Sequence, residues 1–430
     1  MKLLFQAFRD ADIRNKILFT LLMLVLYRIG NFIPVPGVNR TILDSLSNNM
    51  LGMMNLFSGG ALHQFSIFAV GIMPYITASI IIQLLQADVL PKLTEWTNQG
   101  AAGEKKRKKL TRYLTVILAL FQSTAISLGF NKLFPGLVPD PSFKTYAIIV
   151  IVLTLGTIVL MGMGELITKK GIGNGVSLII FAGIVATMPT GIQQYYLTEF
   201  TEVKNGYFLP ILKTAIILIV VILIMMLVIF IQQSSRKIPV NYAVPNADKS
   251  GMQTQKSFLP LKVNSANVVP VIFAVSLFMF PTTIVNFMEV SDTTTWIKNV
   301  LDYTHPIGMT LYALLIIAFA FFYAFIAVDP KKMAENLKNQ RGNIPGVRPG
   351  IETEQYLTKV LMRLTVVGSI FLALISIAPI LISFVADLPQ QVRIGGVSLL
   401  IMTSVVIETV SQINVSKMKK SYRGFLRKKR

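Results

Sequence analysis

The side chains that could do chemistry in this chain are few, and they lie mostly outside its apolar segments. Ion or proton coupling in a membrane needs ionisable groups at midplane, facing a cavity. Glu165 and Glu408 instead fall near the ends of apolar runs, and the only two histidines, His63 and His305, lie outside them. The chain has no cysteine, which excludes disulfides and thiolate metal sites. With no metal-ligand cluster and no Ser/His/Asp arrangement, we expect neither an enzyme nor a cofactor.

One glycine-rich motif, GIGNG, runs from Gly171 to Gly175. It resembles a phosphate-binding loop only loosely, because it opens an apolar run and no strand precedes it. We interpret it as a tight turn rather than a nucleotide site.

Composition indicates what kind of protein carries these residues. Hydrophobic residues make up 53% of the 430 residues and charged residues only 14%, whereas soluble domains carry about 25% charged residues. The apolar residues are gathered into runs of about 20, the signal of membrane helices. Residues 1–16 are polar and no cleavage site follows, so we expect an uncleaved polytopic membrane protein.

We predict an all-α protein with ten membrane-spanning helices. Lys and Arg sort by side, since 33 of the 41 lie in one set of connections and tails and only seven in the opposite set. The positive-inside rule places the richer set, and both termini, in the cytoplasm. The predicted spans are 17–33, 65–85, 113–130, 146–167, 176–195, 209–231, 267–287, 307–328, 361–384 and 395–413.

Ten spans with both ends on one side divide into two halves of five, 1–208 and 209–430, which must be oppositely oriented. That arrangement favours an inverted repeat with a path between the halves. Two long basic loops, 232–264 and 329–359, lie on the cytoplasmic side. The second begins as a polar helix and breaks at NIPGVRPG, which favours docking by Arg348; topology signalling by a solvated linker is the alternative.

A path between these halves would be lined mainly by apolar side chains. Such a lining seals by dewetting and does not select by coordination, which suits an unfolded polypeptide better than a solute. Uncharged polar residues within spans, such as Thr77 and Gln122, are more often contacts between helices than sites.

Five stretches, in order and at matching spacing, resemble the SecY family, whose members form the protein-conducting channel of the bacterial plasma membrane. The resemblance runs from about Arg14 to the C-terminus. It implies two five-helix halves hinged around an hourglass pore, with a short plug helix. The stretches are FSGGALHQFSIFAVGIMPYITASIIIQLLQ, GIGNGVSLIIFAGIV, LPLKVNSANVVPVIFA, DPKKMAENLKNQRGNIPGVRPG and GGVSLLI.

The resemblance implies a pore ring of aliphatic side chains. Two pairs within it are spaced i, i+4, so each pair shares a helix face; without the resemblance these residues would be interpreted as ordinary packing. Val176 is smaller than the isoleucine common in the family, which would loosen the ring there. The ring residues are Ile72, Ile76, Val176, Ile180, Ile272 and Ile401.

The resemblance also implies a lateral gate, the seam between spans two and three and spans seven and eight, through which apolar segments pass into lipid. The short stretch 51–63 before the second span matches the plug; an interfacial amphipathic helix is the alternative. The gate residues are Thr77, Gln83, Gln122, Ser276 and Phe280, and the plug residues are Phe57, Ser58, Gly59, Gly60, Ala61 and Leu62.

The partners that the resemblance implies are SecE and SecG, the motor ATPase SecA, the ribosome, and signal peptides with the unfolded preproteins that carry them. A basic platform suits polyanionic ribosomal RNA. Two other classes stay open: a secondary transporter of the five-plus-five type, and a non-conducting membrane scaffold or receptor. The expected docking residues are Arg348, Lys338, Arg341, Arg236 and Lys249.

Overall fold

The computed structural model describes most of the chain, and the described part is largely helical. The described residues are 10–39, 58–62, 64–86, 90–133, 135–200, 207–245, 252–286, 296–297, 300–301, 305–385 and 396–427. The helices are α2 (Ala11–Gly30), α5 (Met73–Gln86), α6 (Pro91–Asn98), α7 (Ala101–Leu133), α8 (Phe143–Lys170), α9 (Gly175–Phe200), α10 (Phe208–Gln233), α11 (Val269–Asn286), α13 (Pro306–Ala327), α14 (Pro330–Asn339), α15 (Ile351–Val385) and α16 (Gly396–Arg427). The strands are β1 (Ser235–Pro245), β2 (Met252–Lys262) and β3 (Gly342–Asn343).

Ten of these helices, all but α6 and α14, coincide with the ten predicted spans. Seven are long and apolar enough to cross a membrane by themselves, and α5 and α11 are shorter apolar helices. The remaining helix, α2, has polar first turns that carry Asp12, Arg14 and Lys16. The prediction of ten apolar helices in an all-α membrane protein is therefore confirmed.

The second predicted span is wrong at its start. The sequence predicts a helix from Phe65, but α5 begins only at Met73. Positive φ values at Phe65 (43°) and Gly71 (67°) interrupt the helical path. Apolar composition concealed this break, because a buried irregular segment is as hydrophobic as a helix.

The segment before α5 is held by neighbouring backbone instead. The Val35 N–H donates to the Phe65 carbonyl at 3.1 Å, and the Ile67 N–H donates to the Ile33 carbonyl at 3.0 Å. Gly156 of α8 permits close passage, because a Cβ there would lie 1.9 Å from the Ile67 carbonyl oxygen. Irregular backbone at this depth is thus surrounded by protein rather than by lipid.

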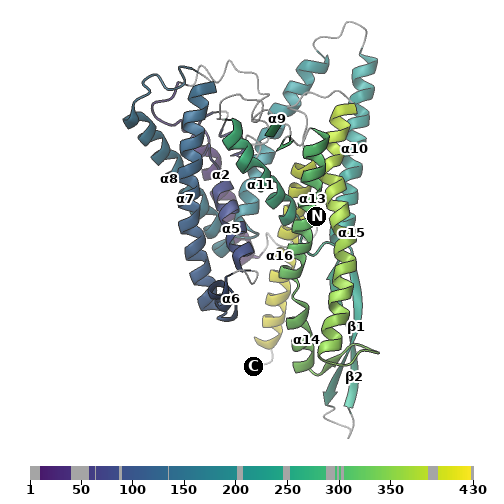
Figure 1. Ribbon diagram of the computed structural model, residues 1–430. Coiled ribbons are helices and arrows are strands. Elements are labelled where there is room, and N and C mark those ends of the chain that lie inside the picture. The colour runs from purple at the N-terminus through teal and green to yellow at the C-terminus, as the bar shows by residue number, and fades with distance from the viewer. Residues whose placement is uncertain are drawn as a thin grey trace.

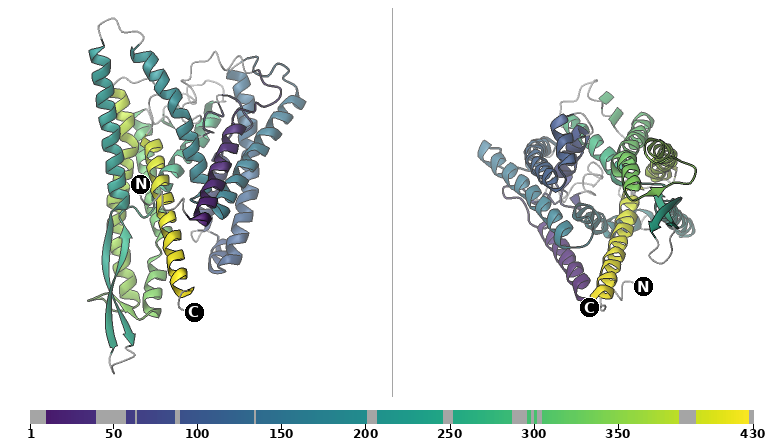
Figure 2. Two further views of the ribbon diagram at one scale, coloured as in Figure 1. Left: turned by 180° about the vertical axis from the view of Figure 1, so that it is seen from behind. Right: turned by 90° about the horizontal axis from the view of Figure 1, so that it is seen from below.

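The helices form two groups with α9 and α11 between them (Figure 1). Helices α2, α5, α7 and α8 make up one group, and α10, α13, α15 and α16 the other. Across the boundary, α11 packs on α5 and α7, while α9 packs on α16. Both views of Figure 2 show the same separation of the two groups.

A small platform projects from one end of the bundle, which we call the hairpin end (Figure 1). Strands β1 and β2 form an antiparallel hairpin from Ser235 to Lys262, and β1 also pairs with β3. Its apolar core joins the hairpin to α14 and α15 through residues that include Ile238, Leu337 and Leu357. The polar helix and the break predicted for 329–359 are confirmed, whereas the sequence analysis missed the hairpin.

Candidate pore, plug and gate

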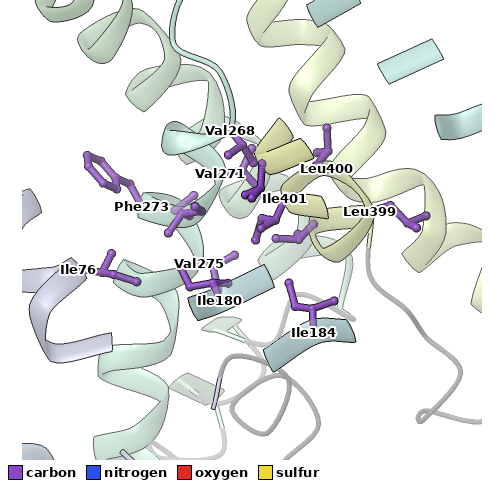
Figure 3. Packing of buried hydrophobic residues seen from close by; sticks show 14 of the residues in the cluster. Ile76, Ile180, Ile184, Val268, Val271, Phe273, Val275, Leu399, Leu400 and Ile401 are labelled. Atoms are coloured by element: carbon purple, nitrogen blue, oxygen red, sulfur yellow. The ribbon is translucent and has the colours of Figure 1, made fainter. Parts of the chain in front are cut away.

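Aliphatic side chains from both groups of helices meet in one buried cluster. Five of the six predicted ring residues belong to it: Ile72, Ile76, Ile180, Ile272 and Ile401. The exposed fraction is 1% for Ile180 and 0% for Ile401. Figure 3 shows Ile76 of α5, Ile180 and Ile184 of α9, and Ile401 of α16 converging on this region. A contact of this kind closes the space between the groups with side chains that cannot hydrogen-bond.

The backbone positions these residues differently from the sequence expectation in two places. Ile72 precedes α5 and accepts a hydrogen bond from the Ile76 N–H at 3.2 Å, so it caps the first turn. Val176 lies in the first turn of α9, where its Cγ2 would lie 3.4 Å from a Cβ placed on Gly164 of α8. Val176 is only partly buried, and its place in the ring stays a prediction.

Ile184 was missed by the sequence analysis. It follows Ile180 by one turn on α9, is buried and belongs to the same cluster. The signal in the sequence was its i, i+4 spacing from Ile180, the same spacing that Val176, assigned from the family resemblance, has on the other side.

The described part of the predicted plug, residues 58–62, is seated beside the end of α2. Three donors at the end of α2, the last from the residue that follows the helix, converge on two carbonyl groups of this segment. The Tyr27 hydroxyl donates to Ser58 (3.1 Å), and the Arg28 guanidinium (2.9 Å) and the Asn31 amide (3.2 Å) donate to Gly59. We call these three side chains the latch. A guanidinium donor makes a stronger, charge-assisted hydrogen bond. Sequence reasoning missed the latch, although Arg28, a charge near the end of an apolar run, was a signal.

Close backbone packing seats the same segment against α9. Gly59 has φ +66°, and a Cβ there would lie 2.7 Å from the Gly183 Cα. A Cβ on Gly183 would in turn lie 3.1 Å from the Gly59 Cα. Gly183 follows Ile180 within one turn, so this contact adjoins the aliphatic cluster. Ala61 joins that cluster directly, while Phe57 lies outside the described residues.

The predicted gate residues lie on α5, α7 and α11, the helices that meet across the boundary. Three of them form hydrogen bonds inside their own helices: Thr77 to the Met73 carbonyl, Gln83 to the Ser79 hydroxyl and Ser276 to the Ile272 carbonyl. The seam between the groups therefore does not use these donors to bind its two sides together.

The other two predicted gate residues are Gln122 and Phe280. Gln122 lies on α7 and is partly exposed. Phe280 belongs to α11, and its side chain lies outside the described part of the chain.

The predicted docking residues gather on the platform, apart from Lys249, which lies outside the described residues. Arg236 is on β1, Lys338 ends α14, and Arg341 precedes β3 with φ 54°. Arg348 projects into solvent, with its side chain 88% exposed. The structure thus brings these basic side chains to one end of the molecule.

The turn that carries Arg348 is held by groups other than its guanidinium. The Arg348 N–H donates to the Glu352 carboxylate at 3.3 Å, and the Arg348 carbonyl accepts from the Thr353 hydroxyl at 2.8 Å. The guanidinium lies 4.0 Å from Glu352, and an ion pair this exposed contributes little. The turn can therefore persist when the side chain is changed.

No group of three or more His, Cys, Asp or Glu residues that could hold a metal ion is found among the described residues. Among the described residues, Arg112 of α7 and Glu165 of α8 form a bidentate ion pair. It braces two helices of the same group, so Glu165 has a structural partner.

Solved structures identify the class of fold. One, "The structure of a protein conducting channel", has a TM-score of 0.68 and 19% identity, with 95% of this chain and 93% of that chain covered. Another, "Sec61 in the Canine ribosome-channel complex from the endoplasmic reticulum", has a TM-score of 0.63 and 18% identity, with 95% and 93% covered. The chain has the ten-helix fold of the SecY and Sec61 channels.

Sequence similarity then identifies the family. The SecY family profile matches residues 66–410. The Protein translocase subunit SecY of Halalkalibacterium halodurans is 51% identical over 422 residues, which cover 98% of this chain and 98% of that protein. The chain belongs to the SecY family, a family of non-enzymatic channel subunits, and the resemblance read from its motifs is confirmed.

Proposed function

We propose that this chain is the central channel of a protein translocase. It would pass unfolded secretory polypeptides across the membrane and release apolar segments sideways into lipid. The observation that carries the proposal is the aliphatic cluster shared by both helix groups, with the seated plug segment beside it. An aliphatic collar accommodates any side chain without hydrogen-bonding it, and it resists wetting when closed.

The two halves, 1–208 and 209–430, would separate at the seam formed by α5, α7 and α11. Thr77, Gln83, Gln122, Ser276 and Phe280 would line it. Because three of these side chains are bonded within their own helices, an entering apolar helix need not break their bonds. The ring would be formed by Ile72, Ile76, Ile180, Ile272 and Ile401, together with Ile184 and the predicted Val176.

We place the hairpin end in the cytoplasm of a bacterium, and the chain in its plasma membrane, because the basic connections lie at that end. The ribosome or SecA would dock there and supply the energy. Sec61, which shares this fold, is described in a ribosome-channel complex, which supports a ribosomal partner. SecE and SecG are proposed from family membership alone.

Reconstitution tests the function directly. Vesicles that contain this chain with SecE and SecG should take up a preprotein into a protease-protected state when SecA and ATP are added. A preprotein whose signal sequence carries a charge in its apolar core should stay accessible to protease. If the vesicles accumulate a labelled small solute but never protect the preprotein, a secondary transporter is the better assignment; a scaffold would do neither.

Docking makes a separate prediction at Arg348. Arg348→Ala should weaken ribosome binding and lower the salt dependence of the affinity by about one unit of log–log slope, as expected for one lost phosphate contact. Co-sedimentation with ribosomes over a range of salt concentrations measures this change. Lys144→Ala, at an exposed position at the start of α8 and away from the platform, is the matched control. Equal slopes for Arg348→Ala and the unmodified chain would remove Arg348 from the docking surface.

A further inference from the structure

The GIGNG motif is a point where three helices approach one loop. A Cβ on Gly171 would lie 2.4 Å from the Thr20 hydroxyl oxygen of α2, and one on Gly175 would lie 1.9 Å from the Gly164 carbonyl oxygen of α8. Gly173 has φ +89°, and a Cβ there would lie 3.2 Å from the Thr409 hydroxyl oxygen of α16. Each glycine therefore permits contact with a different helix.

Two consecutive backbone N–H groups of this loop bond to opposite halves. The Ile172 N–H donates to the Thr20 hydroxyl at 3.1 Å, within the first half. The Gly173 N–H donates to the Gln412 side-chain oxygen at 2.9 Å, in the second half. The loop is thus bonded to both sides of the boundary at adjacent residues.

An apolar contact reinforces these bonds. Ile172 is buried between Ile13 of α2 and Ile413 of α16, and the three form a separate cluster that Ile17 flanks. This cluster lies toward the hairpin end, since α8 ends and α9 begins there. It joins the halves through α2 and α16, whereas the gate seam uses α5, α7 and α11.

The other end of α9 also binds the second half. Glu199 accepts from Lys213 at 2.5 Å, and the Tyr195 and Thr214 hydroxyl groups lie 3.0 Å apart. These contacts flank the direct connection between α9 and α10. Helix α9 is therefore tied to the second half at both ends, while the gate side chains discussed above are bonded within single helices.

We propose that the halves turn about two pivots, one at each end of α9, and that the GIGNG loop is the pivot at the hairpin end. Ile172 is the contact about which the halves rotate, and Gln412 positions the loop. The proposal rests on the proposed channel function, because it specifies how that channel opens. The Glu199–Lys213 ion pair and the Tyr195–Thr214 contact hold one end of the axis. The hydrogen bond and the isoleucine cluster hold the hairpin end without a covalent link.

Pairs of spin labels can measure the separation of the halves at each end. The chain contains no cysteine, so labels attach only where cysteines are introduced. Lys105 and Lys331 are exposed positions on opposite halves near the hairpin end, and Phe143 and Ile307 are exposed positions near the other end. Distances between labels are recorded on the channel complex in lipid nanodiscs.

In the unmodified chain each label pair should give a narrow distribution of distances. The double variant Ile172→Ala/Gln412→Leu should lose the narrow peak of the Lys105–Lys331 pair and keep that of the Phe143–Ile307 pair. Ile172→Ala/Gln412→Glu, which keeps an acceptor oxygen at position 412, should recover part of the peak. Ser411→Ala, an exposed neighbour on α16, is the control and should change neither pair.

Two results overturn the pivot. Unchanged peaks at both ends would show that the loop does not hold the halves, and equal broadening at both ends would show a general structural role. The uptake of preprotein by vesicles carrying the unmodified chain is measured separately. A chain that fails this uptake overturns the channel function, whereas one that succeeds while its pivot variants keep both peaks overturns only the pivot.

Discussion

Replacing Gly183 with valine should unseat the plug and open a leak for ions in the resting channel. Even a Cβ at position 183 would lie 3.1 Å from the Gly59 Cα and 3.2 Å from the Tyr27 hydroxyl oxygen. The two methyl groups of valine occupy space that backbone already fills. Overpacking of this kind costs about 1–3 kcal/mol, which corresponds to roughly a 5- to 150-fold shift in the plug equilibrium.

Conductance across a planar bilayer without SecA or ribosomes measures this leak. Gly162→Val on α8 is the matched control, because it makes the same exchange in a helix where nothing lies within 4 Å of the added Cβ. Neither variant changes the latch residues Tyr27, Arg28 and Asn31 themselves. A Gly183→Val channel as tight as the Gly162→Val channel would show that residues 58–62 do not seal the path.

Truncating the ring should raise resting conductance by a second route. Ile180→Ala/Ile401→Ala removes three carbons from each of two side chains in the shared cluster. At about 0.8 kcal/mol per methylene, the barrier to wetting should fall enough to raise conductance at least tenfold, since ~1.4 kcal/mol is a factor of ten. Conductance of the reconstituted double variant measures the rise.

Destabilisation must be separated from the loss of a seal. Ile238→Ala/Leu357→Ala is the matched control, because both side chains are equally buried but belong to the apolar core of the platform, which contains no ring or plug residue. Thermal unfolding should show similar losses of stability in the two double variants, whereas only the ring variant should conduct. Equal conductance in both would mean that Ile180 and Ile401 are ordinary core residues.

Much of this architecture could be predicted from the sequence, because membrane helices need long apolar runs and cytoplasmic loops gather positive charge. The ten helices followed from those two rules. The late start of α5 did not, since the apolar run from Phe65 continues unbroken through Gly71 while the backbone does not.

The candidate site was harder to predict where it depends on contacts between distant segments. The family resemblance selected Val176 and Ile180. Spacing alone could not choose between Val176 and Ile184 as the neighbour of Ile180, because both lie one turn away. The latch joins residues about 30 positions apart, and local pattern does not reveal such pairing. The glycines at 59 and 183 carry no periodic signal, since both are explained by contacts with segments distant in the sequence.

The internal bonding of Thr77, Gln83 and Ser276 has a consequence for what the gate could recognise. A helix that replaces one wall of the seam need not break these hydrogen bonds. The free energy of the exchange would then follow the apolar area that the helix brings, at about 25 cal/mol per Å². The seam would then select segments by their total hydrophobicity. The order of residues in a segment would matter little, and the number of apolar residues would decide whether it enters.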